Sequence, residues 1–181
     1  TTQNTFDGNM HKGQRWFLKA AKDRGVEQFI GFVNSPPVAL TKNGKAFSSS
    51  SSSFNLAEEN YTLFANYLAD VASYLKDNDG IELSYISPFN EPQWDWGPGK
   101  NGKASQEGTP INNTDLAWAV RKLAGQFESK GLKTSIVIPE AGQIDYLYHA
   151  QQMDQLGKWL YLDKNDKYVS CTRIIKHDGE P

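Results

Sequence analysis

At 181 residues, the chain can bury one hydrophobic core but is too short for two full-sized domains. Its formal charge is -2 and its lysines are scattered, so it lacks the basic face that binding to nucleic acid or to an anionic membrane requires. No apolar run approaches the roughly 18 residues of a membrane span, and one cysteine, Cys171, cannot form an internal disulfide. Five tryptophans within an aromatic content of 12% favour ligands with flat apolar faces, such as sugars.

Helical and strand patterns alternate along the first three quarters of the chain. Segments with apolar residues at helical spacing end at a glycine, and each is followed by a short apolar run that a polar residue or a proline closes. In chain order we expect a helix over 10–24, a strand over 27–34, a Ser/Gly-rich loop over 41–53, a helix over 56–76, a strand over 81–89, a loop over 90–113, a helix over 114–130 and a strand over 135–138. Beyond Gln143 the pattern weakens to a helix around 146–161 and a strand around 168–175. This alternation predicts a parallel α/β sheet.

The five tryptophans divide into two groups by their context. Trp16, Trp118 and Trp159 fall within helical patterns, where we expect them to pack in the core or between helices. Trp94 and Trp96 follow a predicted strand and are candidates for contact with a ligand.

Each predicted strand ends in a polar or acidic residue: Asn34 after the first, Asn90 and Glu91 after the second, and Glu140 after the third. Chemistry at the carboxyl ends of parallel strands occurs both in open doubly wound sheets and in (β/α)8 barrels. The long loops after the strands and the absence of a glycine-rich first turn favour the barrel.

A complete (β/α)8 barrel needs about 250 residues, which is more than this chain has. We therefore expect residues 1–181 to be a fragment of a single catalytic domain that lacks the N-terminal and C-terminal strands of the barrel. The chain begins TTQNTFDGNM, with neither an initiator Met nor a targeting segment. Either a leader was removed, or the chain begins partway through a longer protein.

Residues 85–96, YISPFNEPQWDW, place the carboxylate of Glu91 between an apolar run and two tryptophans. By itself, Asn90-Glu91-Pro92 is also compatible with a turn that ends a strand and leaves the carboxylate in water. Because strand ends of barrels so often carry the chemistry of the protein, we favour a catalytic role for Glu91.

Four segments, FVNSPPVALTKNGKAF, YISPFNEPQWDW, ASQEG and IVIPEAGQIDYLY, together resemble glycoside hydrolase family 30, a family of (β/α)8 retaining glycosidases. The resemblance covers about residues 9–148. Asn-Glu-Pro is common among related families, whereas SPFNEPQWDW followed by QEG is much narrower. Within the family, the chain looks most like bacterial members that cleave β-1,6-linked galactan or related glycans. The resemblance implies a β-linked carbohydrate substrate, no cofactor, and a secreted or periplasmic protein.

Family resemblance gives Glu91 the role of general acid/base and gives Asn90 a hydrogen bond to the sugar 2-hydroxyl. A retaining glycosidase needs a second carboxylate, the nucleophile, about 5 to 5.5 Å from the first. In the family the nucleophile lies at the end of the seventh strand, so we expect it outside this chain. Glu140 would line the site, although a purely structural role stays open, and Glu180 is too close to the chain end to be assigned.

The remaining candidate residues would bind the sugar. The resemblance implies that Trp94 and Trp96 offer apolar faces to pyranose rings, and that Gln106 and Glu107 bind hydroxyl groups from the following loop. Asn34, at the end of the first predicted strand, would contribute to the same surface. Together these residues could bind a glycan even without turnover, so a non-catalytic glycan-binding fragment is the alternative interpretation.

Other chemistries find little support in the sequence. The stretch GPGKNGKA approaches a phosphate-binding loop but fails at Ala104, and neither the strand nor the helix that such a loop needs flanks it. The chain has no HExxH motif and no Cys/His cluster, so we expect no metal site.

Overall fold

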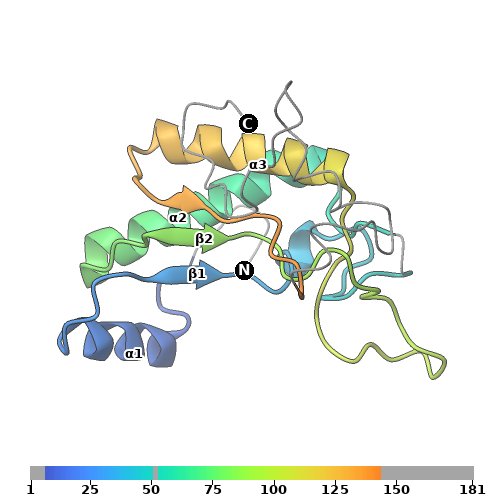
Figure 1. Cartoon of the computed structure of the whole chain (residues 1–181), viewed down its shortest axis with the longest axis horizontal. Helices are drawn as coiled ribbons and strands as arrows, with labels where there is room; N and C mark the ends of the chain where they lie inside the picture. Colours follow the sequence, from blue (N-terminus) through green and yellow to red (C-terminus); the bar gives the residue numbers. More distant parts are fainter. Residues whose placement is uncertain (1–6, 51–52, 144–181) are drawn as a thin grey trace.

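The computed structural model describes residues 7–50 and 53–143 (Figure 1). The helices and strands in this part are α1 (Lys12–Lys22), β1 (Ile30–Phe32), the 3-10 turns η1 (Val38–Leu40) and η2 (Glu58–Asn60), α2 (Tyr61–Asp79), β2 (Tyr85–Ser87), α3 (Asn113–Ser129) and β3 (Ser135–Ile136). The helix expected around 146–161 and the strand expected around 168–175 lie outside the described residues. Among the described residues, none of the helices combines the length and the apolar character that a membrane span needs.

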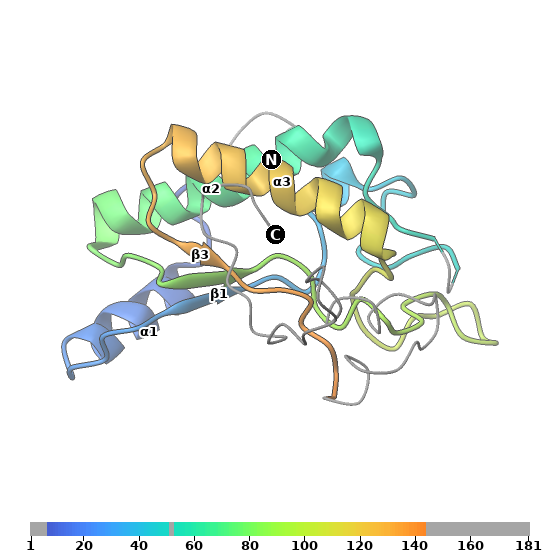
Figure 2. The same ribbon diagram turned by 45° about the horizontal axis from the view of Figure 1, so that its top comes forward.

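The three strands form a parallel sheet in the order β1-β2-β3, so each strand pairs with its neighbour in the sequence. The helices α2 and α3 lie together on one side of the sheet, and α1 lies near β1, away from α3 (Figures 1 and 2). The predicted parallel α/β architecture is confirmed. The strands are shorter than the predicted apolar runs. A strand extends only as far as its backbone forms hydrogen bonds with the neighbouring strand, whereas the apolar run continues beyond that point.

A single core joins the sheet to α2 and α3. Residue Ile86 of β2 pairs with Gly31 and Ile136 at one level of the sheet, and both isoleucines are buried. Gly31 leaves little room for a side chain, since a Cβ there would lie 3.0 Å from the Leu83 side chain, which would have to shift by a few tenths of an ångström. The two helices bury residues at helical spacing: Tyr61, Phe64, Ala65, Leu68, Ala69, Ala72 and Leu75 of α2, and Leu116, Ala119, Val120, Leu123, Ala124 and Phe127 of α3.

An aromatic cluster holds the end of the segment after β2. Phe89, which is buried, lies with its ring centroid 5.4 Å from that of Phe64 and 5.8 Å from that of Phe54. Such tilted and edge-on pairs are the favoured geometries for aromatic rings. Because Phe89 directly precedes Asn90 and Glu91, the core fixes the point from which the candidate site begins.

The helix α1 is held by ion pairs to α2, in addition to the packing of Leu18 and Ala21 against the core. The Arg15 guanidinium donates to both carboxylate oxygens of Asp79 at 2.5 and 2.8 Å, and Lys19 Nζ lies 2.6 Å from the same carboxylate. Arg15 also lies over the ring of Tyr74, 4.7 Å from its centroid. The hydrogen bonds from Arg15, with the added contact of Lys19, lower the pKa of Asp79 to about 2.

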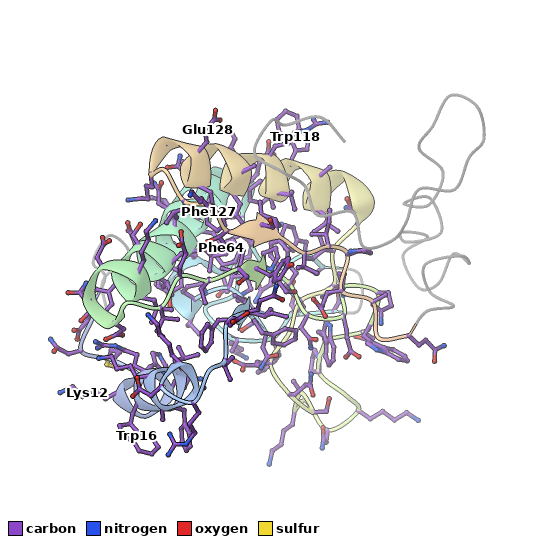
Figure 3. All side chains as sticks on the ribbon, turned by 60° about the vertical axis from the view of Figure 1, so that its left-hand side comes forward. Lys12, Trp16, Phe64, Trp118, Phe127 and Glu128 are labelled. Carbon is purple, nitrogen blue, oxygen red and sulfur yellow. The ribbon has the colours of Figure 1, made fainter. Side chains whose placement is uncertain are left out.

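Two of the helical tryptophans do not pack as expected. Trp16 is 63% exposed and Trp118 is 51% exposed, and Figure 3 shows both on the outside while Phe64 and Phe127 lie inside. The prediction was wrong because helical spacing alone does not say which face of a helix meets the core. Trp159 lies outside the described residues.

Replacing Asp79 by Asn in the full-length protein that carries this chain should lower its stability by roughly 1 to 3 kcal/mol near neutral pH, since two cations lose their counter-charge. A carboxylate with a lowered folded-state pKa stabilises the fold above its ordinary value of 3.8, and this contribution is lost as the pH falls toward 2. The difference from wild type, measured by denaturant unfolding, should therefore be smaller at pH 3 than at pH 6.

Asp70→Asn is the matched control, because Asp70 forms an ion pair with Lys130 at 2.9 Å in which both side chains are substantially exposed. It should cost less than about 1 kcal/mol at either pH. An Asp79→Asn effect that does not shrink at pH 3 would contradict this account.

Candidate active site

Parallel pairing of the strands brings the predicted strand-end residues to one edge of the sheet. Glu91 follows β2 and Glu140 follows β3, and the backbone N–H of Glu91 donates to the carbonyl oxygen of Glu140 at 3.1 Å. Asn34 follows β1 at the same edge. Both glutamates are partly exposed. The structure thus places two acidic residues next to each other at the ends of neighbouring strands.

The two glutamates share an unusual backbone conformation. Among the described non-glycine residues, those with positive φ are His11, Glu91 at 40° and Glu140 at 57°. A left-handed conformation costs an ordinary residue about 1 to 2 kcal/mol, so the surrounding contacts must maintain it. Strain of this kind is often found at functional sites.

The carbonyl oxygen of Glu91 is held from two sides. It accepts a hydrogen bond from the backbone N–H of Trp94 at 3.0 Å and another from Trp96 Nε1 at 2.9 Å. Trp96 is only 8% exposed, and its ring packs so closely on Gly108 that a Cβ there would lie 2.6 Å from ring atoms. The expected role of Trp96 as a sugar platform is therefore corrected: in the described structure its ring is buried and supports the turn of Glu91.

Trp94, in contrast, is 39% exposed and keeps an accessible ring beside Glu91. The side chain of Gln93 is buried, and its amide oxygen faces Trp94 and Gly142. In this orientation it accepts hydrogen bonds from Trp94 Nε1 at 2.9 Å and from the backbone N–H of Gly142 at 3.2 Å. Gln93 was missed by the sequence analysis. Only its position between Pro92 and Trp94 could have pointed to it.

A close approach by Gly142 completes the surroundings of the Glu91 carboxylate. A Cβ at position 142 would lie 2.5 Å from Glu91 Oε1 and 2.8 Å from Trp94 Nε1. A side chain there would require the Glu91 carboxylate and the Trp94 ring to shift. This second missed residue had a weak signal, a glycine two positions after the strand-end Glu140.

The loop after β2 connects the site to the end of β1. Asn34 Nδ2 donates to Glu107 Oε1 at 3.0 Å, and the Ser35 hydroxyl lies 3.5 Å from Glu107 Oε2. Glu107 and Gln106 are exposed, and Asn90 is partly buried beside Glu91. Asn34 and Glu107 are thus neighbours at this edge, and each is a hydrogen-bond partner of the other. Their role in binding sugar stays a prediction.

This arrangement is suited to proton transfer beside an apolar surface. Glu91 can donate or accept a proton, the Trp94 ring can contact a flat ligand face, and Asn34 with Glu107 can exchange hydrogen bonds with hydroxyl groups. The hydrogen bonds to the Glu91 carbonyl oxygen fix the backbone from which the carboxylate extends.

A sequence model of O-glycosyl hydrolase family 30 matches residues 1–177. The chain belongs to this family. Among curated proteins, an endo-beta-1,6-galactanase from Hypocrea rufa is 29% identical over 144 residues, which cover 80% of this chain and 29% of the galactanase. The predicted family resemblance is thus confirmed.

Solved structures agree with this assignment. A conserved exported protein from Bacteroides fragilis is 28% identical, with a TM-score of 0.80 over 92% of this chain and 33% of that protein. The catalytic domain of GH30 xylanase C from Talaromyces cellulolyticus, 21% identical, matches with a TM-score of 0.63 over 86% of this chain and 35% of that domain. The latter likeness concerns the fold alone.

The family 30 relatives also decide the architecture. The three-stranded unit is part of a (β/α)8 barrel, as the loops after the strands predicted. The chain spans about a third of the length of the relatives that it matches. That residues 1–181 form a fragment of one catalytic domain stays a prediction.

Substituting Gly142 by Ala should displace the Glu91 carboxylate or the Trp94 ring, because a methyl group has no room between them. In the full-length protein, we expect a loss of kcat on the order of 10²-fold, comparable to other small misplacements of catalytic groups. The measurement is steady-state hydrolysis of a β-linked glycan together with thermal unfolding.

Gly125→Ala is the control, since a Cβ at position 125 of α3 would meet no neighbouring side chain or loop within 4 Å. Alanine there should leave kcat unchanged and slightly stabilise the helix. If both variants keep wild-type kcat, the close approach at Gly142 has no part in placing Glu91.

Proposed function

We propose that the protein carrying this chain is a retaining O-glycoside hydrolase that acts on a β-linked polysaccharide or oligosaccharide, with Glu91 as the general acid/base. The observation that carries the proposal is the position of Glu91: it follows the central strand β2 in a strained turn that Trp96 and Trp94 hold by hydrogen bonds. Membership of glycosyl hydrolase family 30 supplies the class of reaction.

The mechanism assigns two successive tasks to Glu91. In the first step, its carboxylic acid protonates the glycosidic oxygen while a carboxylate nucleophile attacks the anomeric carbon and the leaving sugar departs. In the second step, the Glu91 carboxylate takes a proton from water, which cleaves the glycosyl-enzyme and restores the starting state. We place the nucleophile outside this chain, and Glu140 beside Glu91 as a residue that lines the site.

The substrate is best sought among galactans. The curated relative from Hypocrea rufa is named as an endo-beta-1,6-galactanase, so β-1,6-galactan is the first glycan to test. The half-exposed ring of Trp94 offers an apolar surface to a pyranose, and Asn34, Asn90, Gln106 and Glu107 offer polar contacts for its hydroxyl groups. Because a similar structure is described as that of an exported protein, we also propose that the protein acts outside the cytoplasm.

A glycan-binding protein without turnover is the second candidate. It is favoured by the fact that this chain supplies the acid/base and gives no assigned nucleophile. Hydrolysis by the full-length protein distinguishes the two, because binding alone releases no reducing ends.

Replacing Glu91 by Gln in the full-length protein should lower kcat/KM on β-1,6-galactan by about 10² to 10⁴-fold, since the amide cannot protonate the leaving oxygen. An aryl glycoside with an acidic phenol needs no such proton, so its first step should be much less affected. Glu128→Gln, which changes an exposed glutamate on α3 (Figure 3), should leave both activities unchanged. Equal losses on both substrates would contradict the role of Glu91 as acid.

The stereochemistry of the first product tests the two-step mechanism independently. Proton NMR during early hydrolysis should show the β-anomer of the new reducing end, because two successive inversions retain the configuration. Initial release of the α-anomer would mean a single inversion and would exclude the retaining mechanism.

A further inference from the structure

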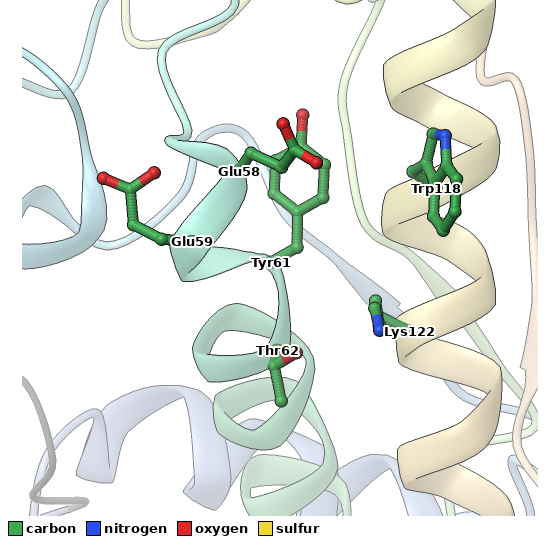
Figure 4. Close-up of a pocket in the computed structure, with 6 residues that line it drawn as sticks. All are labelled: Glu58, Glu59, Tyr61, Thr62, Trp118 and Lys122. Atoms are coloured by element: carbon green, nitrogen blue, oxygen red, sulfur yellow. The ribbon is translucent and has the colours of Figure 1, made fainter.

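A groove on the outer surface of the helices lies apart from the edge that carries Glu91. It has a volume of about 540 Å³ and opens between the start of α2 and the first half of α3. Figure 4 shows Trp118 on α3 facing Glu58 and Tyr61 across this space, with Lys122 on the same helix as Trp118. The residues that line the groove are Glu58, Glu59, Tyr61, Thr62, Trp118 and Lys122.

Trp118 is not required by the core. Leu116 and Val120, its neighbours two positions away on either side, are both buried, which places Trp118 on the opposite face of α3 at about 100° per residue. Trp118 is 51% exposed, and its ring lies near the Arg121 guanidinium, whose central carbon is 5.9 Å from the ring centroid. In a (β/α)8 barrel the next helix packs beside α3 on the flank away from α2, whereas Trp118 borders the groove that α3 shares with α2.

The floor of the groove is rigid. Tyr61 is 5% exposed, and its hydroxyl donates to Asp115 Oδ1 at 2.9 Å, which connects α2 to α3. Burial, with the hydrogen bond to Asp115, raises the pKa of Tyr61 well above its ordinary value, so the hydroxyl stays protonated at any physiological pH. Asp115 is fixed in turn by Asn112, whose Nδ2 lies 2.6 Å from Asp115 Oδ2. A ligand would therefore meet a preformed surface and little ordering cost.

The chemistry of the lining fits a neutral chain of sugars. The indole face of Trp118 can cover the apolar C–H face of a pyranose. Around it, the carboxylates of Glu58 and Glu59 accept hydrogen bonds from hydroxyl groups, while Lys122 and the Thr62 hydroxyl can donate them. Two carboxylates beside one ammonium group disfavour phosphate and other anions.

We propose that this groove is a second glycan-binding site, separate from the catalytic edge, that holds the polymeric substrate on the enzyme. The inference rests on the proposed function for the identity of the glycan. The groove lies where α2 and α3 begin, and these helices start from the same end of the sheet as Glu91. When one part of a glycan polymer is bound in the groove, the other sugars of that polymer stay near the catalytic edge, and their local concentration there is raised.

The test uses affinity electrophoresis of the full-length protein in native gels that contain β-1,6-galactan. Glu91→Gln serves as the background for binding, so that the polymer is not cleaved during the run. Adding Trp118→Ala should raise the dissociation constant for the polymer, obtained from the retardation, by about tenfold or more, since aromatic side chains contribute much of the binding energy at such contacts. Lys122→Gln should weaken it less. Trp16→Ala is the matched control, because Trp16 is a similarly exposed helical tryptophan outside the groove.

Activity on two substrates separates the groove from the catalytic site. With Glu91 intact, Trp118→Ala should raise KM on the polymer and leave hydrolysis of an aryl glycoside at the wild-type rate. If Trp118→Ala and Lys122→Gln both match Trp16→Ala in binding and in KM, the inference is wrong while the proposed hydrolase stands. If the wild-type protein cleaves no β-linked glycan, the proposed function itself is wrong. That result is obtained without any substitution and is therefore distinct from a failure of the groove proposal.

Discussion

The parallel pairing of β2 with β1 on one side and β3 on the other is the constraint on which the rest of the structure depends. It sets Ile86 between Gly31 and Ile136, so one face of the sheet can pack against α2 and α3. It also brings residues from distant parts of the sequence to one edge, where the backbone of Glu91 donates to that of Glu140. Both the core and the candidate site follow from this one register.

At that edge, the well-packed core is followed within two residues by a strained backbone. The core ends at Phe89, which is packed among Phe54 and Phe64, and Glu91 follows two residues later in a left-handed conformation. A strained residue persists only where its surroundings leave it no alternative. Here Trp96 supplies a hydrogen bond from a buried ring, and Gly142 supplies close contact without a side chain. The aromatic residue that resembled a ligand platform is thus part of the support, and Trp94 alone of the pair keeps an accessible face.

The outer surface is organised by other forces. Ion pairs from Arg15 and Lys19 to Asp79 fix α1 at the end of α2, which leaves its apolar residues Trp16 and Phe17 exposed. On α3, by contrast, the exposed Trp118 borders a groove with polar walls. Two tryptophans with the same helical context and similar exposure therefore differ in one respect: Trp118 lines this groove and Trp16 does not.

Much of this protein is determined by its sequence alone. The alternation of helical and strand patterns was enough to predict a parallel α/β fold, and the segments around Glu91 were enough to predict glycosyl hydrolase family 30. Both predictions succeed because local spacing and short motifs are properties of neighbouring residues. The sequence also placed Asn34, Glu91 and Glu140 at strand ends. What it did not determine was which aromatic rings face solvent, as Trp16, Trp96 and Trp118 demonstrate. It likewise missed Gln93 and Gly142, which matter only through contacts across the edge of the sheet. Burial and close approach depend on how distant segments meet, and that is decided only when the tertiary structure forms.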